Sequence, residues 1–287
     1  MIAVPPFFAE YQTIVDAELR RFVPDGDGPV QQSMAYTVHA PSKRVRPVLT
    51  MLAAELCGGT SARALPAACV VELVHAASLI LDDLPSMDDA PLRRGRPTNH
   101  RQFGEAIAIL AAFGLLNMAF GTLAREYEPA LAAGASSLLA NAVGLEGLIG
   151  GQAADLLATD TQISFEMLER IHRGKTGALF NASATAGAMT AGASPAHIAS
   201  LSAFAKNLGL AFQIIDDLLD VEGDPAQTGK ATREDLKKTT FVSFSGVAGA
   251  RQLATELCET ADRALAPFGK RADRLRELSA FVAARFV

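Results

Sequence analysis

Apolar positions recur along almost the whole chain with the three-to-four-residue spacing of amphipathic helices. No run of alternating β-branched residues bounded by hairpin turns interrupts this pattern. Glycine and proline clusters divide it into roughly ten segments, most of them longer than an average globular helix. The pattern predicts an all-α fold.

The predicted helix boundaries coincide with those glycine and proline clusters. They lie at residues 24–29, 57–61, 90–98, 150–151, 159–164, 192–195, 223–232 and 267–269. None of them has the composition of an interdomain linker, and no repeat of about 20 to 50 residues is evident. We therefore expect residues 1–287 to form a single domain, a bundle of about ten or more helices.

Composition narrows the classes of protein that the chain can belong to. With 287 residues, 49% of them hydrophobic, it can bury a full core, and a net charge of −5 argues against a nucleic-acid partner. Three scattered cysteines indicate neither a disulfide framework nor a zinc site. The first residues lack the basic start and continuous apolar run of a signal peptide. We expect a cytoplasmic protein.

Residues 106–124 contain no charged side chain and are long enough to cross a bilayer as a helix. Gly114, Asn117 and Gly121 dilute this run, and alanine outnumbers leucine in it. Such small residues let helices approach closely, as inside a large bundle or at a subunit interface. We expect a helix of that kind and no membrane span, although a span stays open as the alternative.

Six aspartates gather in two clusters inside otherwise apolar sequence. They are Asp82, Asp83 and Asp88 in the first cluster, and Asp216, Asp217 and Asp220 in the second. Isoleucine and leucine neighbours place these carboxylates near a core, where each costs several kcal/mol to desolvate unless a cation or metal pairs with it. A solvated acidic face or a helix cap would explain one such cluster better than two.

The spacing of the aspartates favours a shared divalent cation. Gln213, Asp216 and Asp220 lie on one face of a helix. Pro85 should end the first helix, so that Asp88 returns through a turn. Aspartate oxygens that leave open positions suit Mg²⁺, which binds through one or two carboxylates together with waters and substrate phosphates.

Basic side chains lie before, between and after the two clusters, as an anionic diphosphate would require. They are Lys43, Arg44, Arg46, Arg93, Arg94, Arg96, Lys175, Lys230, Lys237 and Lys238. His75 lies seven residues before Asp82 on the same helical face, as either a ligand or a core histidine. The sequence has neither a P-loop nor a nucleophile motif. Metal-assisted diphosphate chemistry is what remains.

Five segments resemble the trans-prenyltransferase family, the short-chain isoprenyl diphosphate synthases. They are LVHAASLILDDLPSMDD, RRGRPTNH, GGQAADL, GKTGALF and AFQIIDDLLD, in this order over nearly the whole chain. The chain looks most like the bacterial geranylgeranyl diphosphate synthases of carotenoid and bacteriochlorophyll pathways. The resemblance implies helices around a central active-site cavity and a homodimer with a large apolar interface.

The resemblance also implies a role for each matching residue. Three Mg²⁺ ions would lie among Asp82, Asp83, Asp88, Asp216, Asp217 and Asp220. The allylic diphosphate would be held by Arg93, Lys175 and Lys230, and isopentenyl diphosphate by Lys43, Arg46, His75 and Arg94. The space between the substrates would be lined by Gln152, Asp155, Thr176 and Gln213. Ionisation of the allylic diphosphate, condensation and proton loss would add one five-carbon unit.

The chain departs from the family pattern in three places. Pro41-Ser42 stands where the family usually has Gly-Gly, so the loop that presents Lys43 can differ in shape. After Lys230, Arg233-Glu234-Asp235 stands where the family usually has Gly-Lys-Asp. Lys237-Lys238 then replaces the usual Gly-Lys, so that Lys238 is the matching lysine, with a less secure role. A terpene cyclase and a non-catalytic subunit remain rival readings; the cyclase would not need the second diphosphate site.

Product length should depend on the side chains below the first aspartates. Ala77 and Ser78, fifth and fourth before Asp82, are both small. One helical turn is about 5.4 Å, close to one extended prenyl unit, so small residues there leave room for a further unit. We expect geranylgeranyl diphosphate, with farnesyl diphosphate as the alternative. The tunnel could also be closed by Phe113 or Phe120 instead.

Overall fold

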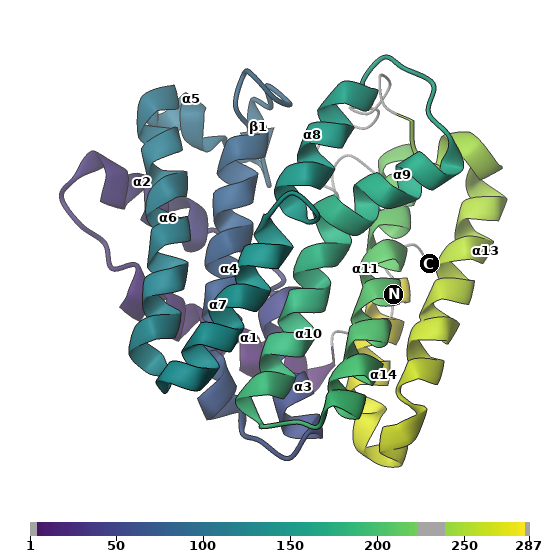
Figure 1. Ribbon diagram of the computed structural model, residues 1–287. Coiled ribbons are helices and arrows are strands. Elements are labelled where there is room, and N and C mark those ends of the chain that lie inside the picture. The colour runs from purple at the N-terminus through teal and green to yellow at the C-terminus, as the bar shows by residue number, and fades with distance from the viewer. Residues whose placement is uncertain (1–4, 223–238, 285–287) are drawn as a thin grey trace.

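The computed structural model describes residues 5–222 and 239–284, and its architecture is all-α (Figure 1). Its helices are α1 (Pro6–Phe22), α2 (Pro29–Val38), α3 (Val45–Leu56), α4 (Ser61–Asp82), α5 (Asn99–Phe103), α6 (Glu105–Glu126), α7 (Pro129–Val143), α8 (Leu148–Ala158), α9 (Phe165–His172), the π-helix η1 (Arg173–Gly177), α10 (Ala178–Thr190), α11 (Pro195–Glu222), α13 (Phe241–Ala264), the 3₁₀-helix η2 (Ala266–Ala272) and α14 (Asp273–Ala283). The helical prediction is confirmed.

Two short strands are the described exception to the helical pattern. The strands β1 (Leu92–Arg93) and β2 (Arg96–Pro97) pair antiparallel. The turn between them uses positive φ at Arg94 and Gly95 (54° and 73°). This hairpin was not predicted, because a two-residue strand leaves no alternation to read.

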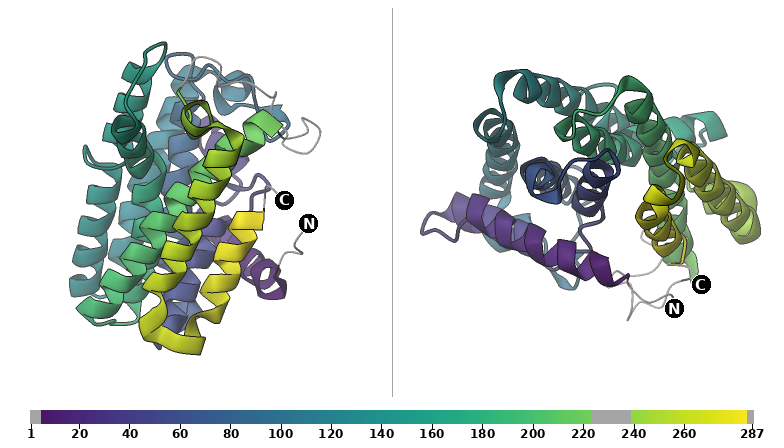
Figure 2. Two further views of the ribbon diagram at one scale, coloured as in Figure 1. Left: turned by 90° about the vertical axis from the view of Figure 1, so that its right-hand side faces the viewer. Right: turned by 90° about the horizontal axis from the view of Figure 1, so that it is seen from below.

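The central helices α3, α4, α10 and α11 carry most of the buried side chains. Each of α3 and α4 packs against α10, and α10 packs against α11. Seen from below in Figure 2, α3 and α4 lie inside a ring formed by the other helices. Both α4 and α11 end near the upper side of the molecule in Figure 1, on the side of the β1–β2 hairpin. The two aspartate clusters therefore lie at one end of the bundle.

The boundaries of α4 follow local chemistry. Its N-cap is Thr60, whose side-chain oxygen accepts a hydrogen bond from the backbone N–H of Arg63. It ends at Asp82, shortly before Pro85, and the N–H of Asp88 then bonds to the carbonyl of Asp82 at 2.9 Å. The predicted break after the first two aspartates is confirmed.

One predicted boundary is wrong. Gly150 and Gly151 lie inside α8, and the chain breaks earlier, at residues 144–147. Gly151 instead lets α8 approach η1 closely. A Cβ added to it would lie 2.3 Å from the backbone nitrogen of Lys175 in η1. A sequence without tertiary contacts cannot distinguish such a glycine from one that ends a helix.

By length and composition alone, four helices of the described chain could cross a membrane: Ser61–Asp82, Glu105–Glu126, Pro129–Ala158 and Pro195–Val221. The apolar run at residues 106–124 lies in the second of them, α6, and is not surrounded by helices of its own chain. Only 39% of its apolar window is buried, and Leu110 and Phe113 are 53% and 64% exposed.

Candidate active site

The first aspartate cluster combines one buried and two accessible carboxylates. Asp83 is buried and receives three hydrogen bonds from the guanidinium of Arg93, at 2.7 to 2.9 Å. Arg93 reaches it from β1. Asp82 is half-buried, and Asp88 is exposed. Burial raises the pKa of Asp82 to about 6, with a further contribution from the carboxylate of Asp88.

The second cluster repeats the arrangement with different partners. Asp217 is buried, and its two oxygens accept hydrogen bonds from the backbone N–H of Phe241 at 3.0 Å and from Nε2 of Gln213 at 3.1 Å. Oε1 of Gln213 accepts from the hydroxyl of Thr176 at 2.9 Å. Asp216 and Asp220 are half-buried on the same helix.

The helices α8 and η1 connect the two clusters. Nζ of Lys175 lies 2.7 Å from Oδ2 of Asp155. The same ammonium group acts on Asp82, where it lowers the pKa that burial raises. Nε2 of Gln152 lies 3.6 Å from Sδ of Met87, in the loop of the first cluster. Oε1 of Gln152 is buried, and none of the described residues gives it a hydrogen bond. This oxygen can accept a hydrogen bond from a ligand.

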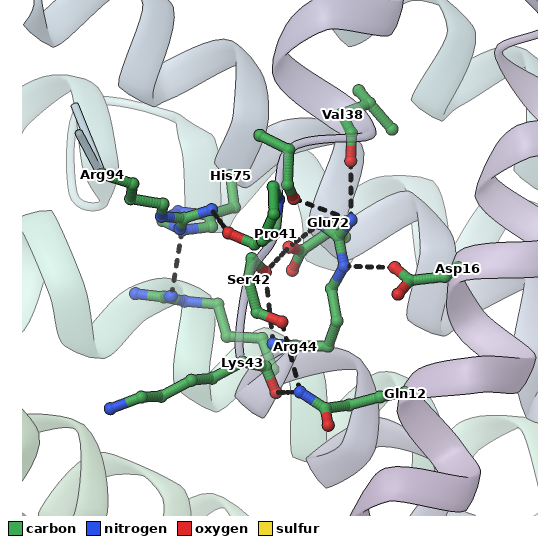
Figure 3. A network of polar contacts seen from close by, with 12 residues as sticks. Gln12, Asp16, Val38, Pro41, Ser42, Lys43, Arg44, Glu72, His75 and Arg94 are labelled. Carbon is green, nitrogen blue, oxygen red and sulfur yellow. Dashed lines mark hydrogen bonds and ion pairs between the residues drawn. The ribbon is translucent and has the colours of Figure 1, made fainter. Parts of the chain in front are cut away.

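The predicted isopentenyl diphosphate residues also come together. Nη1 of Arg46 lies 3.5 Å from Nε2 of His75, and the Arg46 guanidinium lies 4.7 Å from the ring centroid of Phe180. Arg94 donates to the carbonyl of Pro41 at 3.1 Å, and Figure 3 shows Lys43 on the same side of the loop as Arg94. These side chains form one cationic site.

The electrostatics of this cationic site suit a bound anion. Burial lowers the pKa of Arg46 to about 10, and burial together with the neighbouring arginines holds the pKa of His75 well below its usual value. Nε of Arg46 is buried and has no hydrogen-bond partner within residues 5–222 and 239–284. Asp216 is among the charges that act on Arg46, so the cationic site and the second aspartate cluster are electrostatic neighbours.

Residues 28–264 match the sequence profile of the family described as Polyprenyl synthetase. That span is most of the chain and includes both aspartate clusters. The chain belongs to the polyprenyl synthetase family. It is therefore a prenyltransferase of the short-chain trans class. Its substrates are expected at the site just described.

Relatives of this polyprenyl synthetase differ in the product that their names give. A farnesyl diphosphate synthase from Geobacillus stearothermophilus is 40% identical over 272 residues, which cover 92% of each chain. A geranylgeranyl diphosphate synthase from Cyanophora paradoxa is 40% identical over 286 residues, 97% of this chain and 95% of that one. The structure of an FPP/GFPP synthase from Zymomonas mobilis matches with a TM-score of 0.87 and 32% identity, over 97% of this chain and 98% of that one.

Several functional features of this polyprenyl synthetase could not be read from the sequence. The aspartate motifs do not reveal that Asp83 and Asp217 point into the protein. Arg44 looks like a third phosphate ligand beside Lys43, yet its side chain is only 4% exposed and pairs with Glu72. Lys230 and Lys238 lie outside the described residues, so their assigned roles remain predictions.

Proposed function

We propose that this prenyltransferase condenses isopentenyl diphosphate with dimethylallyl, geranyl and farnesyl diphosphates and releases mainly geranylgeranyl diphosphate. One observation carries the proposal: a cationic site at Arg46 and His75 adjoins two clusters of accessible aspartates. An enzyme that binds a single diphosphate would not need both the cationic site and the aspartate clusters. A terpene cyclase, with one diphosphate to bind, would leave the cationic site without a purpose.

We propose Mg²⁺ as the metal, three ions per site, held by the accessible carboxylates Asp82, Asp88, Asp216 and Asp220. Within the described residues, no group of three histidine, cysteine, aspartate or glutamate side chains forms a ready metal cage. This agrees with Mg²⁺, which keeps several waters and uses substrate phosphates as ligands. When bound, the metal would neutralise charge on the departing diphosphate.

The protein groups around the allylic diphosphate supply the rest of the chemistry. Lys175 forms an ion pair with Asp155 at 2.7 Å, and it can exchange this carboxylate for a phosphate oxygen. Arg93 is oriented by Asp83 and holds the same leaving group. The apolar residues beside Asp82 and Asp216 keep water from the allylic cation. The alkene of isopentenyl diphosphate then attacks, and the departing diphosphate accepts the proton.

The depth of the bundle allows a product of fifteen to twenty carbons. A small apolar cavity between α4, α6, α7 and α10 is lined on α4 by Ala67, Val70 and Val71. These residues precede Asp82 by 11 to 15 positions, which is about 16 to 22 Å along the helix, roughly three to four prenyl units. Of the two alternative tunnel floors, Phe113 is excluded within this chain because its side chain faces outward, 64% exposed.

Product analysis tests the proposal directly. The enzyme is incubated with isopentenyl diphosphate and each allylic diphosphate in turn, with and without Mg²⁺, and products are separated by chromatography. We expect Mg²⁺-dependent consumption of isopentenyl diphosphate and accumulation of the twenty-carbon product. Accumulation of farnesyl diphosphate would replace the product assignment. Cyclic hydrocarbons without consumption of isopentenyl diphosphate would favour a cyclase, and no turnover at all a non-catalytic subunit.

A size series at Ala77 tests the assigned wall of the tunnel. Ala77 is fully buried, and Ser78 is half-buried, with its hydroxyl bonded to the carbonyl of His75. We expect Ala77→Val to shift some product and Ala77→Phe to shift most of it to fifteen carbons or fewer, because the side chain fills the path. Thermal unfolding identifies variants that lose stability instead. An unchanged product distribution in folded variants would reject this wall.

We further propose a cytoplasmic homodimer. Exposed apolar side chains of α6 adjoin the largely exposed apolar segment of α7 and α8, where Leu145 and Leu157 are each 81% exposed. A second copy would cover this face. Light scattering should give twice the monomer mass, and Phe113→Glu should lower it. The cysteines Cys57, Cys69 and Cys258 are free thiols, as a reducing compartment allows.

A further inference from the structure

The loop between α2 and α3 is held by side chains of α1 and α4 and by its own Ser42 and Arg44. It carries Lys43 and leads directly into Arg46, so its shape decides where two of the proposed isopentenyl diphosphate ligands lie. Gln12 of α1 donates from Nε2 to the carbonyls of Ser42 and Lys43, at 3.2 and 3.0 Å. Figure 3 shows Lys43 and Arg44 leaving the loop in opposite directions.

Arg44 holds this loop through its side-chain hydrogen bonds. It adopts a left-handed backbone conformation, with φ of 49°, at the N-cap of α3, which is costly for a residue that is not glycine. Its guanidinium donates to Glu72 at 2.6 Å, to Asp16 at 2.8 Å and to the carbonyl of Val38 at 2.6 Å. These bonds hold the backbone in a conformation that an arginine would otherwise avoid.

Glu72 connects the loop contacts of Arg44 to α4, the helix that ends at Asp82. It is 3% exposed, so it does not reach the substrate, and its Oε1 accepts from both Arg44 and the hydroxyl of Ser42. The Ser42 hydroxyl oxygen in turn accepts from the backbone N–H of Arg44 at 3.3 Å. Ser42 therefore contributes two contacts that a glycine could not make.

Glu72 is also the main negative charge facing the cationic site. Burial lowers the pKa of both Arg46 and Arg94, and in each case Glu72 is the strongest opposing influence. It lies three residues before His75 on the same helix, one turn away. A buried carboxylate at this point lets several cations crowd together before the anionic substrate arrives.

We propose that Glu72, acting through Arg44 and Ser42, is a positioning residue for isopentenyl diphosphate. It fixes the loop that presents Lys43 and Arg46 and balances the charge of the cationic site, without contacting the substrate. The inference rests on the proposed function, since it assigns this site to the second substrate. Its effect should fall on that substrate and spare the allylic one.

Steady-state kinetics of Glu72→Gln test this inference. We expect the KM for isopentenyl diphosphate to rise about tenfold, which corresponds to the loss of one charge-assisted hydrogen bond. The KM for the allylic diphosphate should stay within about twofold of the wild-type value. Arg44→Gln should have a similar effect. The double variant should lose no more than either single one, because both remove the same contact.

Two further variants separate positioning from folding. Ser42→Gly removes the hydroxymethyl group together with both contacts of its hydroxyl, and should raise the KM for isopentenyl diphosphate about threefold, with a nearly unchanged melting temperature. Tyr127→Phe is the matched control: its hydroxyl bonds Arg63 and Ala67 at the opposite end of α4, and we expect lower stability with both KM values unchanged.

The outcomes distinguish this inference from the proposed function. If the wild-type enzyme does not consume isopentenyl diphosphate, the proposed function is wrong and this inference is wrong with it. If the wild-type enzyme is active but Glu72→Gln and Ser42→Gly change both KM values equally or neither, the positioning role is wrong and the proposed function stands.

Discussion

In each aspartate cluster the second aspartate is buried, but its hydrogen-bonding partners differ between the two clusters. Asp83 is paired with a guanidinium, so its charge is cancelled inside the protein. The described contacts of Asp217 are hydrogen bonds from the backbone N–H of Phe241 and from Nε2 of Gln213. Similar motifs can thus hold their buried aspartates with different chemical groups.

The largest expected effect is loss of turnover when an accessible aspartate is removed from either cluster. Asp82→Ala and Asp216→Ala should each lower kcat/KM by roughly 10³-fold, since each removes a group that stabilises the departing charge. Because burial raises the pKa of Asp82 to about 6, its removal should not lower the melting temperature. Turnover near the wild-type rate in either variant would contradict the assignment of that cluster.

The buried aspartates should differ in their contribution to stability. Asp83→Asn leaves the Arg93 guanidinium without its carboxylate, and we expect it to lower the free energy of unfolding by about 2–4 kcal/mol. Asp217→Asn still accepts from the N–H of Phe241, so about 1 kcal/mol is expected. Urea unfolding measures both. Equal losses would show that the two charges are compensated alike.

The contact between α8 and η1 holds Lys175 between the two clusters. Gly151→Ala would place a methyl group 2.3 Å from the backbone nitrogen of Lys175, and should cost about 1–3 kcal/mol and reduce kcat. Gly28→Ala is the control, since no atom lies within 4 Å of its added Cβ. If the two variants behave alike, the close approach does not position Lys175.

The helices α4 and α11 also differ at the position seven residues before the first aspartate of each cluster. His75 occupies this position on α4, and Gly209 occupies it on α11. Because the pKa of His75 is depressed in the folded state, below about pH 6.5 the unfolded chain takes up a proton that the folded chain does not. The contribution of His75 to stability should therefore fall by about 1 kcal/mol between about pH 7 and pH 5.5. Asp82 opposes this change over the same range, because its raised pKa of about 6 lets the folded chain take up a proton that the unfolded chain does not.

His75→Asn checks that last prediction. The variant should lose the contribution of His75, measured by urea unfolding as the difference from the wild-type chain, while the contributions of Asp82 and of His39, whose pKa burial also lowers, remain. An equal slope in both proteins would show that His75 does not titrate in this way.

Local chemistry explains which parts of the fold the sequence could predict. Pro85 lies shortly after the end of α4, and a proline is disfavoured in a helix interior, so the turn that returns Asp88 was predictable. The Gly150–Gly151 pair was misread because its function depends on η1, which is distant in sequence. Helical spacing placed Gln213 and Asp216 on one face but could not show that Gln213 would bind Asp217.

At the site, residue types are easier to predict from the sequence than side-chain orientations. Charge singled out Arg46, and spacing left His75 open between a ligand and a core histidine; the structure brings the two within 3.5 Å. The same reasoning could not separate Arg44 from Arg46, because opposite directions from a loop depend on partners such as Glu72 and Asp16. Long-range ion pairs leave no periodic signal.

The helix α4 carries Glu72, His75, Ala77 and Asp82 on one rigid rod. Inserting or deleting one residue among them would shift the later groups by about 1.5 Å and rotate them by about 100°. In the proposed tunnel, a longer or shorter product would therefore require exchanged side chains along a helix of fixed length. Any gain of new product sizes by insertion would have to occur elsewhere in the chain.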